Sequence, residues 1–202
     1  MDLSYGPEYE AFRDELRAFI AANRHRAPAA PGAAQRAGAD AVAWQQLLLE
    51  HGYTARTIPC DYGGFGAEPD ILTSRIIAEE FAAAGVPGGL SNQGISMLVP
   101  TLLELGTEEQ KRRWIAPTLR GEIVWCQGYS EPGAGSDLAA LRTSAREENG
   151  EFVINGQKIW TSRAEHSDLM LLLARTTPRD AVAKRTEGLS IFLVDMREAV
   201  GK

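Results

Sequence analysis

Two short segments carry residues whose types and spacing fit the binding of a cofactor. The first segment, residues 127–137, is rich in glycine and includes the hydroxyl of Ser136 near its end. The second segment, residues 157–162, brings the indole of Trp160 close to the hydroxyl of Ser162. Glycine-rich backbone leaves N–H groups free to face an anion, and an indole offers a flat apolar face. We therefore predict that both segments lie on strand-like runs and bind a planar cofactor that carries phosphate.

Each segment taken alone also fits a simpler role. A Pro-Gly-x-Gly-Ser loop is more often a plain turn, and an indole at a strand end more often lies in a core or an interface. Thr161 and Ser162 can end a strand through local backbone hydrogen bonds. Glu131 and Asp137 are candidate acids or bases, but carboxylates that flank a turn are usually solvated or capping. The segment that begins at Gly133 lacks the third glycine of the GxGxxG motif, and it leads into a strand region and not into a helix. Both features argue against a Rossmann nicotinamide site.

Composition and charge exclude several classes of function. The 202 residues carry a net charge of −6, with no basic stripe that could neutralise the phosphates of a nucleic acid. No apolar run reaches the roughly 20 residues of a membrane span, and the N-terminus lacks a signal pattern. The two cysteines, Cys60 and Cys126, lie far apart, and the three histidines show no metal-ligand spacing. We expect a soluble, cytoplasmic protein that binds no metal.

The spacing of apolar residues predicts helices over the first 120 residues. Gly52 and Gly85 are placed to end two of these helices, and Pro100 should kink or divide the apolar stretch in which it lies. The run that starts at Thr107 and reaches Gln110 fits a capping box, which would open a further helix. The predicted helices cover residues 7–20, 40–50, 69–85, 90–105 and 107–119.

At Gly121 the helical period is lost, and shorter apolar runs predict strands. Asn-Gly pairs at 149–150 and 155–156 are hairpin signals. The polar connection 176–188 is expected to be a mobile loop. Helices followed by antiparallel strands predict an α+β fold with a boundary near residue 121. The predicted strands cover residues 123–129, 152–154, 169–174 and 189–194.

A set of short motifs, in this order and spacing, resembles the acyl-CoA dehydrogenases. The resemblance covers essentially the whole chain. It implies an N-terminal all-α helical domain, residues 1–120, and an incomplete antiparallel β-barrel-like domain, residues 121–202, with FAD between them. It also implies a C-terminal helical domain that is absent here. The motifs are GTEEQK (106–111), SEPGAGSD (130–137), LRT (141–143), NGQK (155–158), WTS (160–162) and AR (174–175).

The resemblance also implies a role for individual residues. Ser130 would sit at the flavin ring, Trp160 would flank the isoalloxazine, and Ser162 would bond near its N5 edge. Ser136 would meet the pyrophosphate and bind the acyl-CoA substrate. Arg163 stands where many relatives have a small residue or Asn. No catalytic residue is assigned, because the family's glutamate base would lie beyond residue 202. The full set of implied cofactor-binding residues is Gln127, Tyr129, Ser130, Gly135, Ser136, Trp160, Thr161 and Ser162.

The activity implied by the resemblance is the FAD-dependent α,β-dehydrogenation of acyl-CoA thioesters in fatty acid or lipid metabolism. An electron-transfer flavoprotein is the implied acceptor, and a homo- or hetero-oligomer is expected. We interpret the chain as a truncated or split N-terminal half that is inactive alone. Two alternatives stay open. One is a non-catalytic flavin-binding or assembly subunit of a heteromeric acyl-CoA dehydrogenase, and the other is a fragment of an acyl-CoA oxidase or flavin monooxygenase of the same fold.

Overall fold

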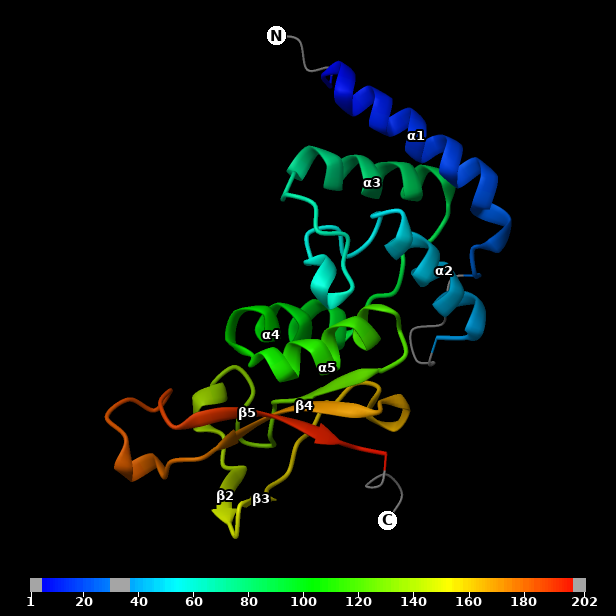
Figure 1. Ribbon diagram of the computed structural model, residues 1–202. Coiled ribbons are helices and arrows are strands. Elements are labelled where there is room, and N and C mark those ends of the chain that lie inside the picture. The colour runs from blue at the N-terminus through cyan, green and yellow to red at the C-terminus, as the bar shows by residue number, and fades with distance from the viewer. Residues whose placement is uncertain (1–4, 30–36, 198–202) are drawn as a thin grey trace. The chain divides into compact units, whose positions relative to one another are not determined.

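A computed structural model describes residues 5–29 and 37–197 of the chain (Figure 1). The chain forms two compact units, which are described separately. Unit 1 comprises residues 1–91 and 95–122, and unit 2 comprises residues 92–94 and 123–202. Among the described residues, no helix is long and apolar enough to cross a membrane. The described part of the chain also holds no group of three or more side chains that could bind a metal ion.

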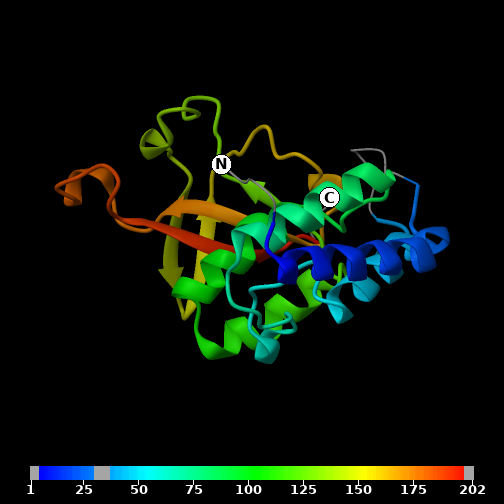
Figure 2. The same ribbon diagram turned by 90° about the horizontal axis from the view of Figure 1, so that it is seen from above.

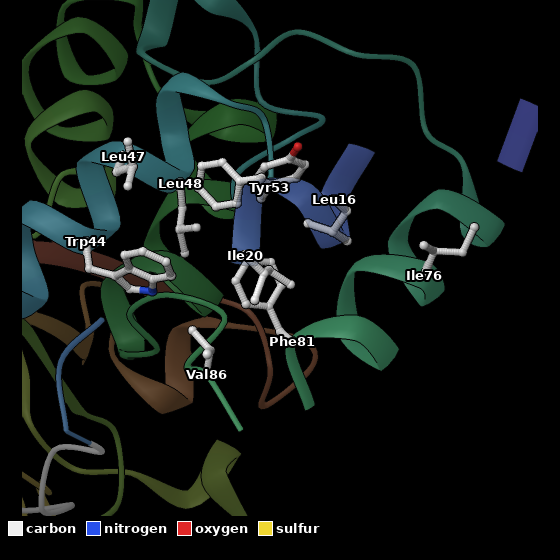
Figure 3. Packing of buried hydrophobic residues seen from close by; sticks show 10 residues of the cluster. Leu16, Ile20, Trp44, Leu47, Leu48, Tyr53, Ile76, Phe81 and Val86 are labelled. Carbon is white, nitrogen blue, oxygen red and sulfur yellow. The ribbon is translucent and has the colours of Figure 1, made fainter. Parts of the chain in front are cut away.

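Unit 1 is helical, as its apolar spacing predicts. The helices α1 and α3 lie side by side in both views of the ribbon (Figures 1 and 2). Leu16 of α1, Leu48 of α2 and Ile76 of α3 are fully buried in one apolar cluster, to which Trp44 and Phe81 add aromatic rings (Figure 3). The helices are α1 (Pro7–Asn23), α2 (Ala39–Glu50), α3 (Ile71–Ala84), α4 (Val99–Leu105) and α5 (Glu108–Leu119).

The predicted helix boundaries in unit 1 have identifiable causes. Thr107 accepts a hydrogen bond from the Gln110 amide, and the Gln110 side chain caps the Thr107 amide, so the predicted capping box is confirmed. Gly85 ends α3 with a φ of +65°, a conformation that glycine adopts without steric cost. Pro100 divides the stretch 90–105 as predicted, because α4 begins at Val99 after a π-helical turn.

Unit 2 is built on a sheet in which β4 pairs with three other strands, β1, β2 and β5. The strand β5 pairs with β4 in antiparallel register from Leu169↔Asp195 to Arg175↔Leu189, and β1 pairs with β4 in parallel. The strand β2 adds a single parallel pairing to β4 and forms an antiparallel hairpin with β3. The strands are β1 (Trp125–Gly128), β2 (Ser144–Glu148), β3 (Glu151–Asn155), β4 (Leu169–Arg175) and β5 (Leu189–Asp195).

The predicted α+β class is confirmed, but the sheet is mixed where antiparallel pairing was predicted. The connection from β1 to β4 contains the whole β2–β3 hairpin, so the chain re-enters the sheet in its original direction. A long crossover of this kind permits parallel pairing, which a tight turn cannot produce. Sequence periodicity identifies the strands but carries no information on the direction of their partners.

The two Asn-Gly signals have different outcomes. Asn149 and Gly150 have φ angles of +55° and +83° and form the tight turn between β2 and β3, as predicted. The pair Asn155-Gly156 forms no hairpin in the described sheet, because β3 ends at Asn155 and the chain continues as an irregular segment. Gly156 instead allows the chain to pass close to Thr143, since a Cβ atom built on Gly156 would lie 2.2 Å from Thr143 Oγ1.

Candidate functional site

The first predicted segment begins at the end of β1 and continues as a tight turn. Gln127 lies on β1, and Tyr129 and Ser130 follow it, all three partly buried. The amide of Glu131 donates to the Ala134 carbonyl at 2.9 Å, and the Ala134 amide donates back at 3.1 Å. These two bonds close a turn that presents the following residues, Gly135 and Ser136, to solvent. The predicted strand in this segment is therefore shorter than expected.

The glycines of this turn leave an open approach to backbone amides. A Cβ atom built on Gly133 or Gly135 would meet no heavy atom within 4 Å. Within the described residues, the amides of Gly133, Gly135 and Ser136 donate none of the backbone–backbone hydrogen bonds. Amides of exposed residues that are not used in these bonds, beside a hydroxyl, are a suitable surface for an anion such as phosphate. We call residues 133–136 the anion loop.

The second segment is irregular where a strand was predicted. Residues 156–163 follow the end of β3 and make no strand pairing in the described sheet. Trp160 adopts a φ of +58°, and the residue is 85% exposed. The Ser162 amide donates to the Trp160 carbonyl at 2.9 Å, which closes a tight local turn. A bulky residue held at positive φ is uncommon and is found where the surrounding structure over-determines it. We call residues 156–162 the indole loop.

Trp160 is not a core residue of the described chain. A flat indole with most of its area in contact with water gains apolar burial if a ring stacks on it. Thr161 is partly buried and Ser162 is exposed, so the Ser162 hydroxyl is accessible on the same loop. An exposed indole, accessible hydroxyls and open amides are features suited to a planar cofactor with a phosphate group. The described residues therefore fit FAD.

A buried ion pair ties the two segments together. Glu131 is 7% exposed and accepts a hydrogen bond from Lys158 Nζ at 2.9 Å. The same Nζ donates to the Tyr129 carbonyl at 3.0 Å. One residue further along each segment, the Ile159 amide donates to the Ser130 carbonyl at 2.9 Å. These contacts bring the anion loop and the indole loop, which lie apart in sequence, into one fixed arrangement.

Glu131 is therefore an anchor, and the expectation of a solvated or capping carboxylate is wrong for this residue. Its second set of partners comes from the segment before β2, where the Arg142 amide donates at 2.6 Å and the Thr143 amide at 2.9 Å. Burial alone would raise the pKa of this carboxyl. The hydrogen bonds that it accepts from Thr143, Arg142 and Lys158 outweigh burial and lower the pKa to about 2. Glu131 is accordingly ionised at neutral pH and fully engaged, which leaves it no free proton-accepting role.

A cavity of about 390 Å³ lies beside this anchor within unit 2. Its lining combines the turn after Glu131 with the segment before β2 and the start of the indole loop. Asp137, the other carboxylate of the first segment, forms an ion pair with Arg185 at 2.8 Å. Both candidate acid–base carboxylates thus have structural partners. The lining residues of the cavity are Glu131, Pro132, Gly133, Ala140, Arg142, Thr143, Gly156 and Gln157.

Sequence reasoning found the motifs LRT (141–143) and NGQK (155–158) but not what they do. Thr143, Gly156 and Lys158 prove to be the supports of the candidate site. The sequence does contain an acid, Glu131, in one motif and a base, Lys158, in another. Their spacing in the chain does not show that the two side chains form an ion pair. Arg163, which was singled out beside Ser162, adopts a φ of +65° and accepts a hydrogen bond from Ser167 Oγ at its carbonyl. Its backbone therefore shapes the exit of the indole loop.

Comparison with known families accounts for both units. The model of the acyl-CoA dehydrogenase N-terminal domain matches residues 6–122, and that of the acyl-CoA dehydrogenase middle domain matches residues 126–201. This chain belongs to the acyl-CoA dehydrogenase family. The resemblance inferred from the ordered motifs is thereby confirmed.

Among curated relatives, the chain is similar to the acyl-CoA dehydrogenase IpdE1 of Mycobacterium tuberculosis. The two are 39% identical over 198 residues, which cover 94% of this chain and 49% of that protein. It is also 35% identical to the acyl-CoA dehydrogenase FadE26 of the same organism, over 96% of this chain and 48% of that protein. The chain thus spans about half the length of the curated relatives it matches.

Two solved structures, each named for two components, share this fold. The ChsE4–ChsE5 complex from Mycobacterium tuberculosis matches with a TM-score of 0.70 and 33% identity, over 98% of this chain and 49% of that chain. The Tcur3481–Tcur3483 steroid ACAD matches with a TM-score of 0.71 and 35% identity, over 97% of this chain and 50% of that chain. Family membership and fold are therefore supported by sequence and by structure.

Proposed function

We propose that this chain supplies a flavin-binding surface to a heteromeric, FAD-dependent acyl-CoA dehydrogenase. The observation that carries the proposal is the anchored pair of loops: Lys158 and Ile159 bind the loop that carries the exposed indole of Trp160 to Glu131 and Ser130, just before the open amides of the anion loop. Family membership supports FAD as the cofactor. The similarity to the ChsE4–ChsE5 complex and to the Tcur3481–Tcur3483 steroid ACAD supports an assembly with a second, different chain.

The proposed roles follow from what each loop exposes. The amides of the anion loop and the Ser136 hydroxyl bind the pyrophosphate, and Ser136 also lies against the acyl-CoA. Trp160 packs on the isoalloxazine, while Ser130 and Ser162 offer hydroxyl donors to its polar edge. Gln127, Tyr129, Gly135 and Thr161 complete the surface. When bound, FAD supplies the two-electron acceptor for α,β-dehydrogenation of an acyl-CoA thioester.

The general base of the proposed reaction comes from elsewhere in the assembly. On either side of the anion loop, Glu131 is held by Lys158 and by backbone amides, and Asp137 is paired with Arg185. The bonds that Glu131 accepts leave it no free proton-accepting role. This chain is then a binding subunit for flavin and acyl-CoA, while a partner of the same family supplies the proton acceptor. An electron-transfer flavoprotein is the proposed electron acceptor.

A ring-bearing acyl-CoA is the substrate class that the comparisons favour. One similar structure is described as a steroid ACAD, and the identity to it is 35% over 97% of this chain. We accordingly propose a CoA thioester with a bulky polycyclic acyl group in preference to a linear fatty acyl-CoA. Dehydrogenation assays of the assembled protein with both classes of thioester would decide between them, and peroxide release during turnover would instead indicate an acyl-CoA oxidase.

The flavin site is tested by replacing Trp160 in the chain copurified with its partner. Trp160→Ala removes the stacking face without removing a buried side chain, so we expect FAD affinity to fall at least about tenfold while the unfolding midpoint stays nearly unchanged. Phe152→Ala, which also removes an exposed aromatic ring from unit 2, is the matched control. Equal FAD affinity in both variants would contradict the proposed role of Trp160.

A further inference from the structure

A buried arginine lies at the end of β4 and bonds to Ala139, three residues after the anion loop. Arg175 is 8% exposed. Its Nη1 donates to the Glu187 carbonyl at 3.1 Å, and its Nη2 donates to the carbonyls of Arg185 at 3.1 Å and Ala139 at 3.0 Å. Its amide donates to the Thr143 carbonyl at 2.8 Å. One side chain thereby joins the segment that follows the anion loop to the segment that precedes β5.

The hydrogen-bond acceptors of this guanidinium are backbone carbonyl oxygens, so the backbone that carries them must be held in place. A cation withdrawn from water must recover its hydration through hydrogen bonds, and a fixed fork of N–H donors needs acceptors at fixed places. The three carbonyls can satisfy the fork only if residues 139, 185 and 187 keep their relative positions. Arg175 therefore holds these segments more firmly than a solvent-exposed contact would.

We call the connection 176–188, which the sequence predicts to be a mobile loop, the arm, and its two ends are joined by backbone hydrogen bonds. The amides of Thr176 and Thr177 both donate to the Gly188 carbonyl, at 2.9 and 3.2 Å. Gly188 has a φ of +70°, and a Cβ atom there would lie 2.7 Å from Thr177 Cβ. The arm thus returns to β4 through a turn that favours glycine, with Glu187 placed at Arg175.

A second contact links the arm to the residue immediately after the anion loop. Arg185 Nη1 lies 2.8 Å from Asp137 Oδ2, and the two side chains are 55% and 50% exposed. Exposed ion pairs contribute little to stability because water and salt screen them. The larger constraint on the anion loop therefore comes from the buried Arg175 and not from this pair.

We propose that Arg175 is a positioning residue for the anion loop, and that it sets the affinity for the phosphate part of the cofactor without affecting the ring part. Residues 133–136 are held on one side by the Glu131–Lys158 anchor and on the other by the Arg175 fork. The first support includes Lys158, a residue of the indole loop two positions before Trp160. The second lies at Ala139 and has no contact with the indole loop among the described hydrogen bonds. This inference rests on the proposed flavin function.

The test compares FAD with riboflavin, which has the same ring and no phosphate, in the full chain copurified with its partner. Arg175→Lys keeps the charge but loses the fork, so we expect FAD affinity to fall about tenfold and riboflavin affinity to change less than about twofold. Gly188→Ala, which displaces the arm from the other side, should give the same pattern. Arg185→Ala should have a smaller effect. Arg179→Ala is the control, since among the described residues the hydrogen bond of its side chain stays within the arm, to the Val182 carbonyl.

Hydrogen exchange of the 202-residue chain without cofactor gives an independent result. We expect faster exchange of the hydrogen-bonded amides in the segments 134–141 and 184–187 of Arg175→Lys, with the paired residues of β4 and β5 unchanged. Unchanged exchange in these segments, or equal losses of FAD and riboflavin affinity, would overturn the positioning role. If the wild-type assembly binds no FAD, the proposed function fails, whereas the exchange result still decides whether Arg175 holds the loop.

Discussion

At the scale of single residues, the Glu131–Lys158 pair is the contact on which the candidate site depends most. Both side chains are more than nine-tenths buried, and breaking a buried pair leaves one charge without compensation. We expect Glu131→Gln to lower the free energy of unfolding by about 3–5 kcal/mol, measured by urea denaturation at pH 7. Glu147→Gln, at an exposed position on β2, is the control and should change it by less than about 0.5 kcal/mol. Similar losses in both variants would contradict the anchor role.

The same carboxyl makes stability depend on pH in a defined direction. The folded protein lowers the pKa of Glu131 from 4.5 to about 2, so the unfolded chain binds the proton more readily. The stabilisation is fully present above pH 4.5 and is lost as the pH falls from there towards 2. The stability difference between wild type and Glu131→Gln should therefore be constant between pH 6 and 7 and shrink below about pH 4.5. A difference that grows on acidification would contradict this sign.

Substitution by alanine should affect stability at one glycine of the site and FAD binding at another. A Cβ atom at position 156 would lie 2.6 Å from the Thr143 Cα atom, so Gly156→Ala must displace backbone. We expect a loss of about 1–3 kcal/mol in the free energy of unfolding. Gly135→Ala meets no neighbour and should cost less than about 0.5 kcal/mol, yet it should weaken FAD binding because the new methyl group hinders approach to the amides. Chemical denaturation and flavin fluorescence titration measure the two effects.

At the scale of elements, local signals decide where helices begin and long connections decide how strands pair. The capping box at Thr107 is legible in sequence because its two hydrogen bonds join residues three apart. Thr107→Ala removes the acceptor for the Gln110 amide, so we expect a loss of about 1 kcal/mol in the free energy of unfolding. Glu104→Ala, on the exposed surface of α4, is the control. No measurable difference between the two variants would show that the cap contributes nothing to α5.

At the scale of the whole molecule, the flavin should stabilise the assembly by mass action. A ligand that binds only the folded protein adds about 2.7 kcal/mol at 100 times its dissociation constant. We expect thermal unfolding of the copurified assembly to shift upward with added FAD, and to shift less in Trp160→Ala at the same FAD concentration. Added NAD should leave the transition where it is. A shift with NAD and none with FAD would contradict the proposed cofactor.

The sequence by itself determined the family, the α+β class and the members of the two loops. Motifs such as SEPGAGSD and WTS, helix periods and the Thr107 cap depend on residues near one another in the chain, so they can be seen without a fold. Only the tertiary structure decided that the sheet is mixed, that the indole loop is irregular and that Gly156 serves a close approach. It alone assigned partners to Glu131 and to Arg175. These features depend on contacts between residues that are not neighbours in the chain, such as Glu131 with Thr143, 12 positions away, and Arg175 with Ala139, 36 positions away. Burial gives such contacts their energy, and burial is a property of the folded chain.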